Sequence, residues 1–226
     1  RYRRRRSSRL LRRSRLVHSP QTIVHSKRRE KMRKKSSQPK SQAREWVESI
    51  IIALILAMII RTFIVQAFKI PSGSMIPTLK IGDRIFVNKF LYGAKVPFTK
   101  FRLPGLKEPE RGDIIVFIST EEPKKDFVKR LIAKGGEKVE IKDGGICVNG
   151  EPIREPPSLR AHYYLNKGDY GREGEGVTVP EDSYFVLGDN SASSRDSRYW
   201  GFVPKTNVLG KVMFIYWPIQ RMKVIK

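Results

Sequence analysis

The sequence predicts a mainly β domain that is preceded by one transmembrane helix and a disordered basic tail. Three observations lead to this fold class. Positive charge is concentrated in residues 1–45, a mostly apolar span of 23 residues runs from Trp46 to Phe68, and residues 69–226 contain short apolar runs separated by turn residues. A chain of 226 residues with this layout has room for one ordinary domain plus accessory segments. We therefore assign residues 69–226 to a single β-rich domain.

The basic tail comes first along the chain. Residues 1–45 carry 18 Lys and Arg side chains and only two acids, so +16 of the formal net charge of +24 belongs to them. Almost no aromatic residues and no apolar periodicity occur there, which predicts disorder. We interpret the tail as a cytoplasmic flank with affinity for anionic lipid. A transit peptide and a nucleic-acid-binding segment stay open as alternatives, although no recognition motif accompanies the basic runs and no specific nucleic-acid partner is expected.

The apolar span from Trp46 to Phe68 is long enough for about 35 Å of helix, and the hydrocarbon core of a bilayer is about 30 Å thick. It includes 11 consecutive residues without a polar side chain, Ile50–Ile60. Its two charged residues are tolerable, because Glu48 lies near the interfacial end and the Arg61 side chain can extend to the outer interface. We predict one membrane anchor, with the basic tail in the cytoplasm and the chain from Lys69 onward across the membrane.

Short alternating or continuous apolar segments predict the strands of the β domain, and the Gly-rich turn at Asp143–Gly145 predicts a hairpin. No long amphipathic helical pattern follows residue 69. Residues 152–180 are rich in Pro, Gly and charge, which predicts a long loop or insertion. The predicted strands are 83–88, 113–118, 127–132, 139–141, 146–148, 184–187 and 212–217.

The β domain has few residues for the commonest catalytic arrangements. Its one histidine, His162, lies in the polar insertion, so a Ser-His-Asp triad would have a poor base. No His and Cys cluster has metal-ligand spacing and no Gly-rich phosphate loop is present, so we predict no metal and no cofactor. The one cysteine, Cys147, has no partner in this sequence for an intrachain disulfide and is predicted to be a buried structural residue.

A hydrolase without a histidine needs another base, and a lysine can serve when burial lowers its pKa. Lys129 lies within the apolar predicted strand 127–132, where its side chain can face an apolar surface. Ser72 and Ser74 lie in a Pro- and Gly-containing turn directly after the apolar span. Taken separately, such serines are typical of turns, and such a lysine is typical of a strand residue that extends its amine to water.

Taken together, four sequence blocks resemble one family, the type I signal peptidases, which are membrane-anchored serine proteases. The resemblance covers nearly all of residues 46–226. It reproduces the family's order of a nucleophile block, a second strand block, a general-base block and a closing block, which makes it far more specific than any single motif. The four blocks are Pro71–Leu79, Arg111–Phe117, Asp126–Arg130 and Gly188–Phe202.

The resemblance implies Ser74 as the nucleophile and Lys129 as a neutral-amine general base. It further implies an oxyanion hole formed by the Ser72 hydroxyl and the Ser74 backbone N–H. The implied reaction is cleavage of secretory preproteins through an acyl-enzyme, after small residues in an Ala-x-Ala pattern. The implied fold is a domain of coiled antiparallel sheets whose exposed apolar surface lies on membrane lipid.

In the closing block, the resemblance implies that Ser194 hydrogen-bonds and orients the amine of the base, and that Asp196 and Arg198 form a supporting ion pair. The sequence departs from the family in four ways, none at a presumed catalytic residue. Phe127 stands where tyrosine is frequent, residues 134–137 replace a Pro-Gly-Asp turn, a cysteine pair of some relatives is absent, and one anchor is present where some members have two.

The implied location is the inner, or plasma, membrane of a bacterium, with a single-pass anchor, a cytoplasmic N-terminal side and the catalytic domain outside. The thylakoid membrane is the alternative. Two other protein classes stay open. Self-cleaving repressor proteases share Ser-Lys chemistry but lack a membrane span, and a non-enzymatic anchored β-scaffold would have no reason to bring Ser74 and Lys129 together.

Overall fold

The computed structural model describes residues 42–95, 99 and 101–225, so most of the predicted basic tail lies outside the described residues. Helix α2 (Gln42–Ile59) includes the last four residues of that tail, and the prediction of disorder through residue 45 was wrong there. Residues 42–45 are Gln, Ala, Arg and Glu, which are all good helix formers. They also place Arg44 one turn before Glu48, and the two side chains form an i,i+4 ion pair at 3.1 Å.

The apolar helix ends earlier than the sequence predicted. After α2 comes one π-helical segment, Ile60–Ile64, and the chain then enters strand β1 (Val65–Lys69). The predicted helix end at Phe68 was therefore wrong. Strand β1 pairs antiparallel with β2 (Arg84–Asn88), in the register Val65↔Asn88 to Lys69↔Arg84. Apolar content alone does not separate the end of a helix from the start of a strand, because both continue the hydrophobic run.

Gln42–Ile64 is the one helix, within the described part of the chain, whose length and composition suit it to cross a membrane. None of its side chains is buried against protein. A helix that is apolar on all sides and leaves those sides uncovered is suited to a lipid environment.

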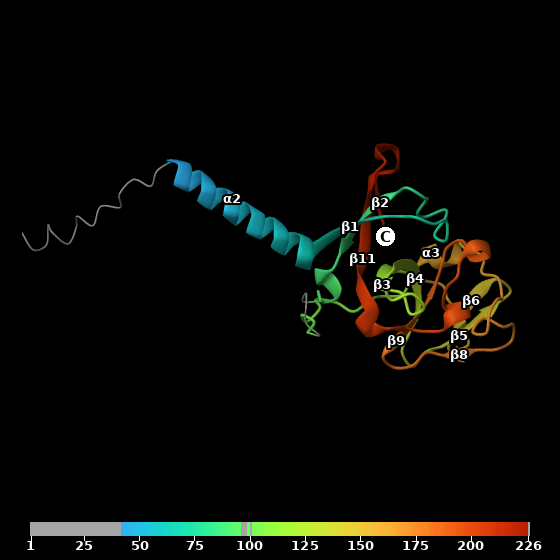
Figure 1. Cartoon of the computed structure of the whole chain (residues 1–226). Coiled ribbons are helices and arrows are strands. Elements are labelled where there is room, and N and C mark those ends of the chain that lie inside the picture. Colours follow the sequence, from blue (N-terminus) through green and yellow to red (C-terminus); the bar gives the residue numbers. More distant parts are fainter. Residues whose placement is uncertain (1–41, 96–98, 100, 226) are drawn as a thin grey trace, which may run out of the picture. The chain divides into compact units, whose positions relative to one another are not determined.

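The larger sheet is antiparallel throughout and has the strand order β1-β2-β11-β3-β4-β9-β10, with β12 paired to β11. Figure 1 shows the long strand β11 beside β2 and β3, which are its partners in the sheet. A smaller sheet has the order β7-β6-β5-β8. The remaining strands of the larger sheet are β3 (Ile114–Ile118), β4 (Asp126–Lys134), β9 (Ser183–Leu187), β10 (Val203–Pro204), β11 (Val208–Trp217) and β12 (Lys223–Val224). Those of the smaller sheet are β5 (Lys138–Lys142), β6 (Gly145–Val148), β7 (Glu151–Pro152) and β8 (Val177–Thr178).

Every predicted strand is present, including the hairpin of β5 and β6 around Asp143–Gly145, and the mainly β fold of antiparallel sheets is confirmed. The strands that the sequence did not predict are β1 and four strands of two residues each, β7, β8, β10 and β12. A two-residue strand has no alternation to detect, so only its partner defines it.

The prediction for Cys147 was wrong. Ile146 and Val148 on the same strand are buried, whereas Cys147 is only half-buried. Successive side chains of a strand point to opposite faces, so the two flanking apolar residues take the core face and leave Cys147 on the other.

Residues 152–180 contain no long helix or strand. They contain the four-residue helix α3 (Pro157–Arg160) and strand β8. This segment is nevertheless part of the core, because Leu159 and Tyr164 are buried in a cluster with residues of the smaller sheet. The loop is therefore held against the domain by apolar burial.

The turn that carries the candidate serines is anchored in a second apolar cluster. Met75 and Leu79 expose 1% and 0% of their surface and pack with buried residues of β2, β3 and β11. Ile70, just before the turn, belongs to the same cluster. Truncating a buried Leu or Met costs about 2–5 kcal/mol, so these anchors fix the backbone around Ser74 firmly.

Candidate active site

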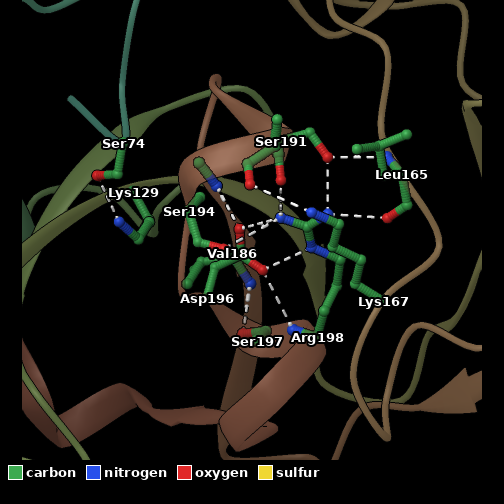
Figure 2. A network of polar contacts seen from close by, with 12 residues as sticks. Ser74, Lys129, Leu165, Lys167, Val186, Ser191, Ser194, Asp196, Ser197 and Arg198 are labelled. Atoms are coloured by element: carbon green, nitrogen blue, oxygen red, sulfur yellow. Dashed lines mark hydrogen bonds and ion pairs between the residues drawn. The ribbon is translucent and has the colours of Figure 1, made fainter.

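The turn after β1 and strand β4 bring Ser74 and Lys129 together. Ser74 lies in the turn after β1, and Lys129 lies on β4, where its backbone is opposite Ile115 of β3. The Lys129 Nζ donates a hydrogen bond to the Ser74 Oγ at 2.7 Å, and both side chains are buried. Figure 2 shows the two side chains pointing toward one another. A base within hydrogen-bond reach of a hydroxyl is the geometry that proton transfer requires.

Burial lowers the pKa of the Lys129 amine from 10.5 to about 8. The negative charges of Asp196 and Asp189 raise that pKa, and the positive charge of Arg198 lowers it. Desolvation is the largest effect, because removing an ammonium from water disfavours its charged form. A useful fraction of Lys129 is therefore neutral near neutral pH and able to accept a proton.

The two candidate oxyanion donors are placed differently. The Ser72 side chain is exposed, and its Oγ lies 3.5 Å from the Ser74 Oγ. That distance is long for a hydrogen bond between hydroxyls, so the Ser72 hydroxyl is near Ser74 without being engaged by it. The backbone N–H of Ser74 donates to no acceptor among the described residues. Both donors are thus available for a ligand beside Ser74.

Ser194 does not make the predicted hydrogen bond to Lys129. Within the described residues, its Oγ is buried and has no hydrogen-bond partner. The hydroxyl lies against Gly188, where a Cβ would clash with it. The Lys129 amine is directed to Ser74 instead, as Figure 2 shows.

Asp196 and Arg198 form the predicted ion pair, with Nε and Oδ1 2.8 Å apart and both side chains 0% exposed. Each ion also has other partners. The Asp196 Oδ2 accepts the backbone N–H of Gly188 at 3.0 Å, and Arg198 donates to the Leu165 carbonyl and to the Ser191 hydroxyl and carbonyl (Figure 2). A buried pair with its hydrogen-bonding groups satisfied holds the surrounding loop in one conformation.

A second buried ion pair was not predicted. Arg130 makes two hydrogen bonds to Asp189, Nε to Oδ1 at 2.7 Å and Nη2 to Oδ2 at 2.6 Å. Thr78 of the nucleophile turn also donates to Asp189, and the His162 Nε2 lies 3.4 Å from the Asp189 Oδ2. Asp189 therefore links the turn that carries Ser74 to the residue that follows Lys129.

A signal for this pair was present in the sequence. The Gly188-Asp189-Asn190 segment directly follows a predicted apolar strand, and Arg130 ends the general-base block. Because successive side chains of a strand point to opposite faces, the sequence predicts that Arg130 points away from the face of Lys129, but it does not identify the partner of Arg130. The partner depends on the pairing of β4 with β9, in which Arg130 is opposite Leu187.

Beside the two residues lies a cleft of about 450 Å³. Its apolar wall includes Ile70, Met75, Phe127 and Val128, and both Ser74 and Lys129 line it. The pairing of β4 with β9 begins at Arg130, so residues 126–129 are paired to β3 on one side only. The cleft thus combines apolar side chains with an unpaired strand edge, which suits an extended peptide.

This domain is mainly β, and in it a serine hydroxyl is hydrogen-bonded to a buried lysine amine. Serine hydrolases that use an amine as their base have this arrangement. Comparison with known proteins identifies the family. Residues 43–217 match the family described as "Signal peptidase, peptidase S26". The chain belongs to this family and is an enzyme of the signal peptidase I class.

Three relatives support this assignment. Signal peptidase I of Leptolyngbya laminosa is 39% identical over 170 residues, covering 72% of this chain and 74% of that protein. Probable signal peptidase I-2 of Synechocystis is 39% identical over 171 residues, covering 74% and 69%. Signal peptidase I of Pseudomonas aeruginosa is 35% identical over 196 residues, covering 72% and 69%. A solved structure of a signal peptidase I from Enterococcus faecalis aligns at a TM-score of 0.40 with 36% identity, covering 47% of this chain and 98% of that chain.

Proposed function

We propose that this signal peptidase cleaves signal peptides from secretory preproteins with Ser74 as nucleophile and Lys129 as general base. The observation that carries the proposal is the 2.7 Å hydrogen bond between the Lys129 Nζ and the Ser74 Oγ. The lowered pKa of Lys129 and its burial beside a cleft support it. No other arrangement among the described residues pairs a hydroxyl with an equally buried amine.

The reaction is acyl transfer in two halves. Neutral Lys129 takes the Ser74 proton as the Oγ attacks the carbonyl carbon, and the carbonyl electron pair moves to its oxygen. Collapse of the tetrahedral intermediate breaks the C–N bond, and the Lys129 ammonium gives its proton to the departing amine. Water then attacks the acyl-enzyme while Lys129 accepts one of its protons. Release of the acid returns a proton to Ser74.

We propose that the other residues of the site support the chemistry of Ser74 and Lys129. The Ser72 hydroxyl and the Ser74 N–H donate to the oxyanion, which needs donors placed before charge develops. The Asp196–Arg198 pair supports the loop on which Ser194 lies.

The cleft suits an extended peptide with small side chains. A peptide added along the free edge of residues 126–129 presents alternate side chains to the apolar wall. A space of about 450 Å³ shared by several substrate residues leaves room for small side chains before the scissile bond, the Ala-x-Ala pattern. The proposed substrate is therefore a signal peptide that ends in small residues.

We further propose that Gln42–Ile64 is a single-pass anchor with the basic N-terminal side in the cytoplasm and the catalytic domain outside. Only residues 65–73 separate this helix from Ser74 along the chain. The membrane is the bacterial inner membrane, with the thylakoid membrane as the alternative, and its lipid is the second partner. Protease added outside intact cells should cut residues after 69 and spare the basic segment, and the opposite pattern would invert the topology.

The function is tested with the purified full chain and a preprotein that ends its signal peptide in Ala-x-Ala. We expect Ser74→Ala and Lys129→Ala each to abolish cleavage, and the double variant to be no worse, because the two residues act as one unit. Matched controls are Ser183→Ala, at the start of β9, and Lys134→Ala, at the far end of β4. Substantial turnover by either folded active-site variant would refute the assignment.

A further inference from the structure

Asn190 holds the backbone on both sides of the Ser74 α-carbon. Its side-chain Nδ2 donates to the Gly73 carbonyl at 3.0 Å, and its backbone N–H donates to the Ser74 carbonyl at 3.0 Å. Gly73 and Asn190 are 117 positions apart in sequence. These two hydrogen bonds connect the nucleophile turn to the loop that follows β9.

The first of these hydrogen bonds determines the direction of a catalytic donor. The Gly73 carbonyl and the Ser74 N–H belong to one peptide group, which is planar and trans, so they point in opposite directions. Fixing the carbonyl toward the Asn190 amide therefore fixes the Ser74 N–H on the side away from Asn190. That N–H has no acceptor among the described residues, so it is free for a substrate oxygen.

The two residues before Asn190 are held by buried polar contacts. The Gly188 N–H donates to the Asp196 carboxylate, and Asp189 is bound by both Nε and Nη2 of Arg130. A Cβ at Gly188 would lie 2.5 Å from the Ser74 carbonyl oxygen, so the two backbones are in direct contact. An orienting group on such a loop does not need to reorganise when charge develops on the substrate.

The hydrogen bond also affects the strength of the donor. An amide whose carbonyl accepts hydrogen bonds becomes more polarised, and its N–H becomes a better donor. The Gly73 carbonyl accepts two, from the Asn190 side chain and from the Ile76 N–H at 3.2 Å. Only the first depends on a side chain that can be replaced.

We propose that Asn190 is a positioning residue of the oxyanion hole, which acts by orienting and polarising the Gly73–Ser74 peptide so that the Ser74 N–H faces the developing oxyanion. The inference rests on the proposed roles of Ser74 and Lys129. It adds to them a side chain that touches neither the substrate nor the base.

The test compares Asn190→Ala and Asn190→Asp with the unmodified full chain. The Asp variant keeps the shape but replaces the amide donor with a carboxylate, and both variants keep the backbone N–H that holds the Ser74 carbonyl. In Asn190→Ala we expect kcat to fall about 10-fold with KM nearly unchanged, less than the 10²–10³ that loss of a direct oxyanion donor costs. The acid limb of its pH profile should not move, because no charge near Lys129 changes. In Asn190→Asp kcat should fall at least as far, and the acid limb should move to higher pH, because a nearby negative charge raises the pKa of an amine.

Asn207→Ala is the matched control. Asn207 is also half-buried and its Nδ2 also donates to a backbone carbonyl, that of Ile118, at 3.1 Å. Its loss should change thermal stability about as much as Asn190→Ala does and leave kcat unchanged. An equal fall of kcat in Asn207→Ala would show that general loosening of the fold, and not the oxyanion hole, is responsible.

Affinity for an inhibitor that forms a tetrahedral adduct distinguishes an effect on the oxyanion hole from an effect on substrate binding. A peptide boronic acid ending in alanine forms an anionic adduct with a nucleophilic serine, so Asn190→Ala should weaken its affinity about as much as kcat falls. Binding of the uncleaved peptide to Ser74→Ala should be the same with and without Asn190→Ala. Unchanged kcat in both Asn190 variants, or equal weakening of peptide and boronic acid, overturns the proposal. Activity retained by Ser74→Ala would instead overturn the proposed function.

Discussion

The proposed base, Lys129, has a pKa of about 8, and this value sets the pH dependence that we expect for cleavage. Only the neutral amine of Lys129 can accept the Ser74 proton. At pH 7 about one molecule in ten has that form, and at pH 9 about nine in ten do. An exposed lysine with its ordinary pKa would be neutral in fewer than about one molecule in a thousand at pH 7. We therefore expect kcat/KM to rise about tenfold between those two pH values.

The assay is steady-state cleavage of a synthetic signal-peptide substrate from about pH 6 to pH 10, with protein stability followed in parallel. His162→Ala is the control, because His162 is the other group near the site that titrates close to neutrality. Burial lowers the pKa of His162 below its ordinary 6.5, so its titration lies well below that of Lys129. A flat profile, or an acid limb that disappears in His162→Ala, would refute the lysine base.

The same lowered pKa makes a prediction about stability. The folded-state pKa of Lys129 lies below its ordinary value of 10.5, so the unfolded chain binds more protons between about pH 8 and 10.5. The free energy of unfolding should therefore rise with pH through that window. Below the window, the buried Lys129 ammonium lowers the free energy of unfolding by its full amount. Lys129→Met should therefore be inactive yet more stable at pH 7, by up to about 3 kcal/mol in urea unfolding. A less stable Lys129→Met, beside an unchanged Lys134→Met, would contradict the argument.

Three other substitutions test the supporting structure. Arg198→Met leaves the buried Asp196 carboxylate unpaired, so urea unfolding should show a loss of about 3–5 kcal/mol, and a loss below about 1 kcal/mol would mean that the pair is not needed. Gly188→Ala pushes a Cβ against the Ser74 carbonyl, so kcat should fall about 10²-fold while the domain stays folded, and wild-type kcat would show that the loop can move away. Ser72→Ala removes one proposed oxyanion donor, so kcat should fall about 10²–10³-fold with little change in KM, and equal changes in both would indicate a binding role instead.

The local pattern of apolar and polar residues was enough to predict most of the fold. The alternation Arg84-Ile85-Phe86-Val87-Asn88 and the continuous apolar run of β3 each predict which side chains face the core, and the observed burial follows those patterns. The same rule, applied to β6, would have placed Cys147 off the core face. The sequence did not separate Val65–Phe68 from the preceding helix, because an apolar run is compatible with either until a partner strand is known.

The residues that we propose as catalytic could also be named from the sequence, because the type of a side chain and the sequence block that contains it are local properties. The contacts between these residues could not be predicted from the sequence. Ser74 and Lys129 are 55 positions apart, and Arg130 and Asp189 are 59 apart. Whether an amine reaches a hydroxyl at 2.7 Å depends on strand register and side-chain rotamers, which long-range packing decides.

Ser194 and Asn190 are the clearest examples of residues whose contacts could not be predicted from the sequence. Family resemblance gave Ser194 a hydrogen bond to Lys129, yet its hydroxyl is buried without a partner among the described residues. Asn190 lies in a Gly-Asp-Asn segment of the kind that is typical of turns, yet its side chain donates a hydrogen bond to the Gly73 carbonyl beside Ser74. The elements that form, and the chemical groups that they carry, can be predicted from the sequence, because burial patterns and residue types are local properties. The pairs of groups that come into contact depend on the folded structure, because a hydrogen bond requires an accuracy of tenths of an ångström between segments that are far apart in the chain.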